Sequence, residues 1–378
     1  MTGENRKIRL LLTGGGTGGH LFPAVATAQE FQKQMPDVEV LFVGTKRKVD
    51  TKSLGAYGFS SESIMSYGLK GKNPLEMLKA LAVLPLSVIQ AMKIIRRFSP
   101  DIIFGVGGYV TGPVIGAGKN LGIPIVIHEQ NSVPGLANRK LGKIADKVCL
   151  SLPGSGSYFP DDKILYTGNP VRNNILELAG KPLPQNKEQD GSNGRRTLLV
   201  LGGSQGAQAV NSLVTEALCS LTDAELQAIK VIHQTGDRDE ELVKNTYLKR
   251  GVSAEVAGFF TQMHEIYEQA DLLVSRAGAT TLSEIAVLGK PAILIPYPSA
   301  ADNHQEKNGE YYVSGGGAVQ FNQKELTAKQ LNETILQLIN NQEKLNSMGA
   351  AMKRLAFPDA AEKIVACCLE QIEKRRVK

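Results

Sequence analysis

Two glycine-rich turns are the first features of this sequence that could do chemistry. GGGTGGH spans residues 14–20 and GGSQGAQ spans residues 202–208, and each follows an apolar run typical of a buried strand. Glycine lets the backbone N–H groups of such a turn face a ligand, and the following helix adds a partial positive charge at its N-terminus. Two such turns, one in each half of the chain, predict a charged, phosphate-bearing ligand held by both halves.

Two side chains in these turns are candidates for a chemical role. His20 lies where the first turn passes into a helix, and a neutral imidazole there can accept a proton from a substrate hydroxyl. The helix N-terminus disfavours the cationic form. His20 is therefore a candidate general base, with a capping or packing histidine as the alternative. Ser204 offers a hydroxyl in the second turn, either to a phosphate or as a helix N-cap.

The first turn also fits a dinucleotide-binding pattern. Gly14, Gly16 and Gly19 satisfy GxGxxG, but the second strand ends in VGTKRK and supplies no acid for an adenosine ribose. The cations at 46–48 could hold a 2′-phosphate, which keeps NADP as an alternative. An NADP oxidoreductase is the weakest hypothesis, because it leaves the second glycine turn unexplained.

Polar groups follow other predicted strands. Glu284, in the first turns of the helix after SRAGA, can accept both hydroxyls of a ribose or complement the helix dipole. Residues 302–305 gather at a helix start, where they can read sugar hydroxyls or cap the helix. In the first half, the residues expected on the ligand side of the sheet are Glu129, Asn131 and Asn138. Arg172 of GNPVR can pair with a diphosphate or form a surface salt bridge.

Motifs of metal chemistry and of P-loop nucleotide binding are missing from the sequence. It holds no HExxH and no GK[ST], and the acids at 237–239 are typical of a helix start. The four cysteines form neither a CxxC pair nor a zinc spacing, which fits a reducing cytoplasm. We therefore expect no metal and no cofactor, because helix N-termini and an arginine can assist the departure of a nucleotide diphosphate.

Buried parallel strands must position these groups. Short apolar runs that end near glycine alternate with helical stretches in both halves, which predicts βαβ units and parallel sheets. The runs are IRLLLTGGG, VEVLFVG, DIIFGVGG, PIVIHEQN and KVCLS, then TLLVLGGS, IKVIHQTG, SAEVAGF, DLLVSRAG and PAILIP. The predicted fold class is α/β, with two Rossmann-like domains facing each other across a cleft.

The length of 378 residues suits two domains, and the composition shows where they divide. Residues 180–196 have the proline, glycine and polar content of a linker. We place one Rossmann-like domain at residues 1–172 and the other at residues 173–356. Helical segments are expected at about 327–354, followed by a break at Pro358 and a last helix.

Charge is distributed unevenly along the chain. Residues 1–172 hold 21 Lys and Arg against 12 Asp and Glu, whereas the rest hold 22 against 25. A basic first half favours an anionic partner: phosphate, nucleic acid or an acidic membrane surface. The stretch from Tyr67 to Phe98 is apolar and edged with cations, which suits an anionic membrane surface, with a core-facing amphipathic helix as the alternative. The expected membrane patch comprises Leu75, Leu78, Lys72, Lys93, Arg96 and Arg97.

Taken in order, these motifs resemble those of the MurG family. The set is GGTGGH, HEQN with a following GL and Asn, GNPVR, GGSQGA, and SRAGATTLSE with GKPAILIPYP and DNHQ, spread over about residues 8–310. Each motif is weak alone, but the ordered set is highly specific. The resemblance implies a fold of the glycosyltransferase B type, with an acceptor- and membrane-facing first domain, a UDP-sugar-binding second domain, and a C-terminal helix, here 357–378, that packs back on the first.

The activity that the resemblance implies belongs to peptidoglycan synthesis. Such a hexosyltransferase moves N-acetylglucosamine from UDP-N-acetylglucosamine to the 4-hydroxyl of undecaprenyl-diphospho-N-acetylmuramoyl-pentapeptide (lipid I) and forms lipid II. Configuration inverts, which requires a base and a stabilised leaving group but no covalent intermediate. The implied location is peripheral, on the cytoplasmic face of the cell membrane. The implied partners are both substrates and the anionic membrane surface, without nucleic acid; other cell-wall synthesis proteins are compatible.

Residue roles follow from the same resemblance. His20 is the base, Glu129 and Asn138 lie on the acceptor side, and either His304 or Gln305 contacts the sugar, since the family often has paired glutamines there. The other substrate-binding residues that it implies are Thr17, Gly18 and Gly19 at the donor or acceptor diphosphate, Asn131 at the N-acetylglucosamine, Arg172 and Ser204 at the UDP phosphates, Phe260 at the uracil, and Ala279, Thr280, Thr281, Leu282, Ser283 and Glu284 around ribose and phosphate.

Two other functions use the same two-domain plan. A UDP-N-acetylglucosamine 2-epimerase-like isomerase would share the donor half but would need several acidic residues for proton transfer and no lipid site. The basic, apolar first half argues against it. A non-catalytic carrier-lipid or nucleotide-binding protein would make His20 dispensable.

Overall fold

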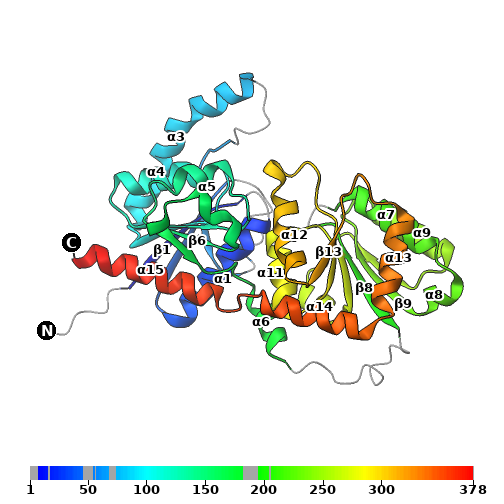
Figure 1. Cartoon of the computed structure of the whole chain (residues 1–378). Helices are drawn as coiled ribbons and strands as arrows, with labels where there is room; N and C mark the ends of the chain where they lie inside the picture. Colours follow the sequence, from blue (N-terminus) through cyan, green and yellow to red (C-terminus); the bar gives the residue numbers. More distant parts are fainter. Residues whose placement is uncertain are drawn as a thin grey trace. The chain divides into compact units, whose positions relative to one another are not determined.

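The computed structural model divides the chain into two compact units. Unit 1 comprises Met1–Asn173 and Phe357–Lys378, and unit 2 comprises Asn174–Ala356. The residues that the structure describes are 7–15, 18–45, 54–55, 57–67, 74–181, 195–203 and 206–377, without the side chains of 18 and 74–81. Each unit is built on one parallel sheet with helices on both faces (Figure 1).

The sheet of unit 1 has the strand order β3-β2-β1-β4-β5-β6-β7, and all its pairs are parallel. Its strands are β1 (Arg9–Thr13), β2 (Glu39–Gly44), β3 (Ser60–Ser63), β4 (Ile102–Gly105), β5 (Ile125–Glu129), β6 (Lys147–Leu150) and β7 (Ile164–Tyr166). The helices of the unit are α1 (Gly18–Gln34), α3 (Pro74–Phe98), α4 (Thr111–Asn120), α5 (Leu136–Leu141) and α15 (Ala360–Val377), with the 3₁₀ turns η1 (Pro153–Tyr158) and η2 (Asp161–Lys163).

The sheet of unit 2 has the order β10-β9-β8-β11-β12-β13 and is also parallel throughout. Its strands are β8 (Arg196–Leu201), β9 (Ile229–Gln234), β10 (Ala254–Ala257), β11 (Leu272–Ser275), β12 (Ala292–Leu294) and β13 (Ala318–Gln320). The helices are α6 (Asn173–Gly180), α7 (Gln208–Cys219), α8 (Asp223–Gln227), α9 (Glu240–Arg250), α10 (Met263–Gln269), α11 (Ala279–Leu288), α12 (His304–Ser314), α13 (Ala328–Ile339) and α14 (Gln342–Arg354), with the 3₁₀ turn η4 (Ala301–Asn303).

Alternation along the buried strands divides the core of unit 1 into two layers. Leu10 and Leu12 of β1 pack with Phe31 of α1 on one face, and Leu11 packs with Ile95 of α3 on the other. Helix α15 joins the first layer through Ile364 and its neighbours and lies beside α1 (Figure 1). Because both faces are covered, the central strands carry continuous apolar runs, as the sequence predicted.

Every apolar run predicted as a strand is one, but the sequence missed the edge strands β3, β7 and β13. The helical stretch predicted at about 327–354 is two helices. Asn341 accepts a hydrogen bond from the backbone N–H of Lys344 and so caps the start of α14. The final helix, α15, begins after Pro358, where the break was expected.

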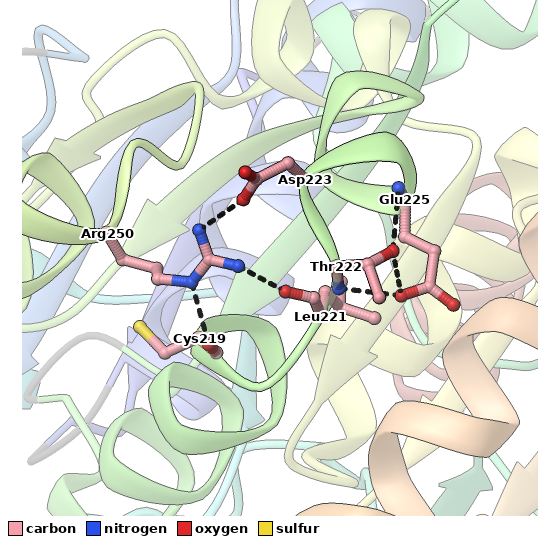
Figure 2. A network of polar contacts seen from close by, with 6 residues as sticks. All are labelled: Cys219, Leu221, Thr222, Asp223, Glu225 and Arg250. Atoms are coloured by element: carbon pink, nitrogen blue, oxygen red, sulfur yellow. Dashed lines mark hydrogen bonds and ion pairs between the residues drawn. The ribbon is translucent and has the colours of Figure 1, made fainter.

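A polar network fixes the short helix α8 in unit 2 (Figure 2). Thr222 and Glu225 form a capping box. Arg250, at the end of α9, donates to the carbonyls of Cys219 (3.0 Å) and Leu221 and pairs with Asp223 (2.8 Å). One guanidinium therefore holds the α7–α8 turn against α9.

We expect Arg250→Lys to weaken this turn by about 1–2 kcal/mol, because an ammonium cannot serve both carbonyls and the carboxylate with one planar fork. Hydrogen exchange of the amides of α8 and α9 measures the change. Asp223→Ala is the matched control: it removes only an exposed ion pair and should cost about 0.5 kcal/mol or less. Equal effects of the two substitutions would show that the carbonyl contacts contribute nothing.

Candidate active site

In unit 1, the candidate residues meet at the carboxyl ends of the central strands. His20 is the third residue of α1, directly after the glycine turn that follows β1. Gly107 follows β4 with a φ of +97°. A Cβ on Gly107 would lie 3.3 Å from Cε1 of His20 and 3.4 Å from Nδ2 of Asn138. A side chain at position 107 would therefore crowd the imidazole, and glycine lets the backbone after β4 come close to His20.

A chain of hydrogen-bonded, buried polar groups begins at Nδ1 of His20. Its Nδ1 lies 3.0 Å from Oε1 of Gln130, and Nε2 of Gln130 donates to the carbonyl of Val106 at 2.9 Å. The same Nε2 lies 3.1 Å from Nδ1 of His128, whose Nε2 lies 3.1 Å from the carbonyl of Gly168. The half-buried His20 is thereby connected to the interior of the unit.

His128 is fully buried, and burial lowers its pKa to about 4. The carbonyl of Gly168 opposes this shift, and the nearby His20 adds slightly to it. At neutral pH His128 is therefore uncharged.

Glu129 organises the loop after β5. One carboxylate oxygen accepts from the backbone N–H (2.9 Å) and the side-chain amide (3.1 Å) of Asn131, and the other accepts from Asn138 (2.9 Å) and the backbone N–H of Gly135 (3.2 Å). Asn138 is 3% exposed, and its Oδ1 has no hydrogen-bond partner among the described residues. A buried acceptor of this kind can accept a hydrogen bond from a ligand hydroxyl.

The remaining unit 1 candidates divide by how far the structure describes them. The guanidinium of Arg172 lies 4.5 Å from the ring centroid of Phe22, so an aromatic face on α1 orients it. Gly18 and Gly19 open α1, which directs their backbone N–H groups to the carboxyl edge of the sheet. Thr17 lies outside the described residues.

In unit 2, Gln234 joins two of the predicted segments. At the end of β9, its Nε2 donates to the carbonyl of Gly203 in the second glycine turn at 3.2 Å. Its Oε1 accepts from the backbone N–H of Phe260 at 3.1 Å. Phe260 and the glycine turn are therefore held in one arrangement. Ser204, in the same turn, lies outside the described residues.

The predicted ribose carboxylate is buried and held by a tyrosine. Glu284 is 3% exposed, and its Oε2 accepts a hydrogen bond from the hydroxyl of Tyr267 at 3.0 Å. It is the sixth residue of α11, beyond the first turn, so complementing the helix dipole does not explain it. No side chain caps the N-terminus of α11, which leaves the backbone N–H groups of its first turn, within residues 279–283, suited to a phosphate.

The loop after β12 is strained where the sequence predicted sugar contacts. Asp302 and Asn303 have φ values of +55° and +53°, a region that non-glycine residues rarely adopt and that is common at binding sites. His304 donates from Nδ1 to the carbonyl of Ala301 at 2.8 Å. Oε1 of Gln305 accepts from the backbone N–H of Tyr297 at 2.9 Å, which fixes the amide of Gln305 at the start of α12.

The predicted membrane patch falls on α3. Lys93, Arg96 and Arg97 are exposed on this helix. Arg97 forms an ion pair with Glu62, so part of its charge is neutralised. Lys72 and the side chains of Leu75 and Leu78 lie outside what the structure describes.

The sequence reasoning did not single out Gln130, His128, Gln234 or Tyr267. A signal for the first two was present, since HEQN places four consecutive polar residues at the end of a buried strand. Polar groups in such a place must be hydrogen-bonded, and a partner of that kind is often a catalytic group. Tyr267 gave no signal, because its partner is distant in the sequence.

Among the residues that the structure describes, no group of three or more His, Cys, Asp or Glu side chains is arranged to hold a metal ion. The candidate groups of unit 1 include an imidazole close to a glycine, and those of unit 2 include a helix start without a side-chain cap and a buried carboxylate. With two parallel Rossmann-like sheets, they are groups of the kind that a nucleotide-sugar transferase uses.

Comparison with known proteins identifies the class. Residues 10–150 match the glycosyltransferase family 28 N-terminal domain, and residues 197–364 match the family's C-terminal domain. A UDP-N-acetylglucosamine–N-acetylmuramyl-(pentapeptide) pyrophosphoryl-undecaprenol N-acetylglucosamine transferase of Desulfotalea psychrophila is 56% identical, over 98% of this chain and 99% of that protein. The chain therefore belongs to the MurG family of these transferases.

Solved structures agree with this assignment. The crystal structure of Acinetobacter baumannii MurG superposes with a TM-score of 0.74 at 29% identity, covering 96% of this chain and 99% of that one. The fold is accordingly the glycosyltransferase B type that the sequence predicted. A putative UDP-N-acetylglucosamine 2-epimerase from Listeria monocytogenes superposes with a TM-score of 0.71 over 97% of both chains. At 14% identity, this similarity shows a shared fold alone.

Proposed function

We propose that the protein transfers N-acetylglucosamine from UDP-N-acetylglucosamine to the 4-hydroxyl of the muramoyl-pentapeptide of lipid I, forming lipid II for peptidoglycan. The observation that carries the proposal is the 56% identity along 98% of the chain with a transferase whose name states this donor and this acceptor. Unit 1 takes the acceptor and unit 2 takes the donor.

The chemical step is a single displacement. The acceptor oxygen forms a bond to the anomeric carbon of N-acetylglucosamine, the bond from that carbon to the UDP oxygen breaks, and its electron pair leaves with the diphosphate. The proton of the acceptor hydroxyl passes to the imidazole of His20. The position of His20 supports this role, because it stands at the start of α1, at the carboxyl ends of the central strands, with the backbone of Gly107 close to its ring.

The donor is held by groups that need not change charge. The N-terminus of α11 and the glycine turns stabilise the diphosphate as negative charge develops on it, and Arg172 supplies a full positive charge. Glu284 binds the ribose hydroxyls and the backbone of Phe260 meets the uracil. Asn131, with His304 or Gln305, contacts the sugar, and the buried Oδ1 of Asn138 accepts a hydroxyl on the acceptor side.

The decisive experiment incubates the pure protein with labelled UDP-N-acetylglucosamine and a short-chain lipid I analogue. The expected products are the β-linked disaccharide on the lipid and one UDP for each disaccharide. Formation of an epimerised UDP-sugar without any disaccharide would overturn the proposal and show that the protein is an isomerase. Binding of both substrates without turnover would replace it with a non-catalytic binding protein.

We further propose peripheral attachment to the cytoplasmic face of the membrane through α3. Within the described ranges, no helix combines the length and apolar character needed to cross a bilayer. Helix α3 exposes Leu86 (44%) and Ile89 (51%) on the face that continues to Lys93 and Arg96. Its N-terminal end extends away from the sheet of unit 1 (Figure 1). An apolar surface bordered by cations suits anionic lipid headgroups.

Replacing both Lys93 and Arg96 with glutamine is expected to weaken binding to phosphatidylglycerol-containing vesicles about 10–30-fold at low salt, because each cation near the surface contributes about 1 kcal/mol. Vesicle sedimentation measures the change. The charge-matched control replaces the exposed Lys249 and Lys344 of unit 2 with glutamine and should have little effect. An equal loss in that control would mean that net charge, not the α3 surface, drives attachment.

A further inference from the structure

We infer that Gln130 is a positioning residue for the base: it holds the His20 imidazole in the tautomer that carries its proton on Nδ1, so that the lone pair of Nε2 faces the acceptor hydroxyl. His128 in turn locks Gln130. This inference rests on the proposed role of His20 as the base, and it adds two residues that act on the reaction through His20.

The orientation of the Gln130 amide follows from its neighbours. Its Nε2 lies 2.9 Å from the carbonyl oxygen of Val106 and 3.4 Å from that of His128. Carbonyl oxygens only accept hydrogen bonds, so the NH₂ group must face them. The opposite assignment would set the amide oxygen against two other oxygens. Oε1 of Gln130 therefore faces His20.

The tautomer of His20 follows from that orientation. Nδ1 of His20 lies 3.0 Å from Oε1 of Gln130, and an amide oxygen has no proton to donate. Nδ1 must therefore carry the proton and donate it. In the neutral ring this leaves Nε2 as the acceptor. The same Nδ1–H bond persists when Nε2 has taken the substrate proton, so the reaction does not break it.

His128 prevents the amide of Gln130 from rotating. Its Nε2 lies 3.1 Å from the carbonyl of Gly168, which accepts, so this nitrogen carries the proton and Nδ1 is left to accept from Gln130. Burial keeps the ring neutral, with a pKa of about 4. Position 168 requires glycine, because its φ is +83° and a side chain there would collide with Phe357.

A neutral amide is well suited to support a base that must start without a proton. A carboxylate at position 130 would stabilise the imidazolium, whereas an amide oxygen orients the ring without adding charge. Two ionisable groups immediately precede Gln130 on β5: His128, which is buried and neutral, and Glu129. Glu129 shares its charge among four N–H donors, three in the loop after β5 and one on α5.

The first test needs no substitution. In the intact protein with ¹⁵N-labelled histidine, the two ring nitrogens of His20 report the tautomer directly, and His20→Asn assigns the signals. We expect Nδ1 protonated and Nε2 unprotonated in the neutral ring. His128 should show the reverse pattern and remain neutral down to about pH 5. A neutral His20 with its proton on Nε2 would overturn the inference, whatever the activity.

The second test is Gln130→Met, which keeps the side-chain length and removes every hydrogen bond of the side chain, to His20, Val106 and His128. Nδ1 of His20 loses its acceptor, so both tautomers should be populated. We expect kcat to fall about 10–100-fold with the KM for UDP-N-acetylglucosamine little changed, and the acidic limb of the pH profile of kcat/KM to shift. The matched control is Gln371→Met, another buried glutamine of unit 1, on α15, whose Nε2 has no partner among the described residues.

The outcomes separate this inference from the function on which it rests. If Gln371→Met has the same kinetic effect as Gln130→Met, or if Gln130→Met leaves both the tautomer and the pH profile unchanged, Gln130 is only a structural residue. If His20→Ala is fully active, the base assignment fails first. Disaccharide formation by the wild type upholds the transferase in either case.

Discussion

Replacing His20 with alanine is expected to lower kcat about 10²–10⁴-fold, the contribution typical of a general base. The KM for UDP-N-acetylglucosamine should change less than about threefold, because no contact with the donor is assigned to the His20 side chain. The reason is geometric: His20 stands at the start of α1 close to Gly107, with Nδ1 engaged by Gln130. Steady-state kinetics at saturating lipid I analogue measure the two effects separately.

His20→Asn makes the test stricter. Asparagine keeps a polar side chain of similar reach but has no group that can accept a proton at neutral pH, so it should be as slow as alanine. His264→Ala in α10, a histidine within hydrogen-bond distance of Asn174, is the control and should retain activity. Near-normal turnover by His20→Ala would remove this residue from the base role. A parallel loss of donor affinity would instead make it a binding group.

The sequence predicted the elements whose positions depend on burial. Strands such as β1 and β4 are covered on both faces, and a continuous apolar run is the pattern expected in such a place. The missed strand β3 has the sequence SSES and pairs only with β2, at the edge of the sheet. Its stability comes from the backbone ladder, which side-chain polarity does not reveal.

Helix α3 shows a second limit of sequence reasoning. Pro85 is expected to interrupt a helix, yet α3 runs from Pro74 to Phe98 with this residue inside it. Tertiary packing of Ala91, Ile94 and Ile95 outweighs the local cost of the proline. Local propensity alone would therefore misjudge the continuity of this helix.

The candidate groups could be chosen from the sequence, but the side chains that hold them in place could not. His20 and Glu284 stand in early helix turns and Glu129 ends a strand, where motif and position predict a role. Their partners depend on contacts across the sheet: Gln130 is 110 residues from His20, and Tyr267 reaches Glu284 from another helix. Such pairs are set by topology, which a single sequence does not state.

Glu284→Gln is expected to weaken binding of UDP and UDP-N-acetylglucosamine about 10–100-fold, because a hydrogen bond to a charged acceptor contributes about 1.5–3 kcal/mol. An amide presents one acceptor oxygen in place of two and cannot accept both ribose hydroxyls. Turnover at saturating donor should fall less, since the ribose is remote from the bond that breaks. Isothermal titration with UDP measures the affinity without the acceptor.

Tyr267→Phe separates positioning from contact at the same carboxylate. Without the 3.0 Å bond from the tyrosine hydroxyl, Glu284 keeps its charge but loses the donor that fixes one oxygen, so donor affinity should fall by a smaller factor, about 3–10-fold. Tyr247→Phe is the control, because it also removes a buried tyrosine hydrogen bond in unit 2, to His233 at 3.0 Å. It should cost stability without changing UDP affinity. Unchanged UDP affinity in Glu284→Gln would refute the ribose assignment, whereas equal losses in both tyrosine variants would trace the effect to general weakening of unit 2.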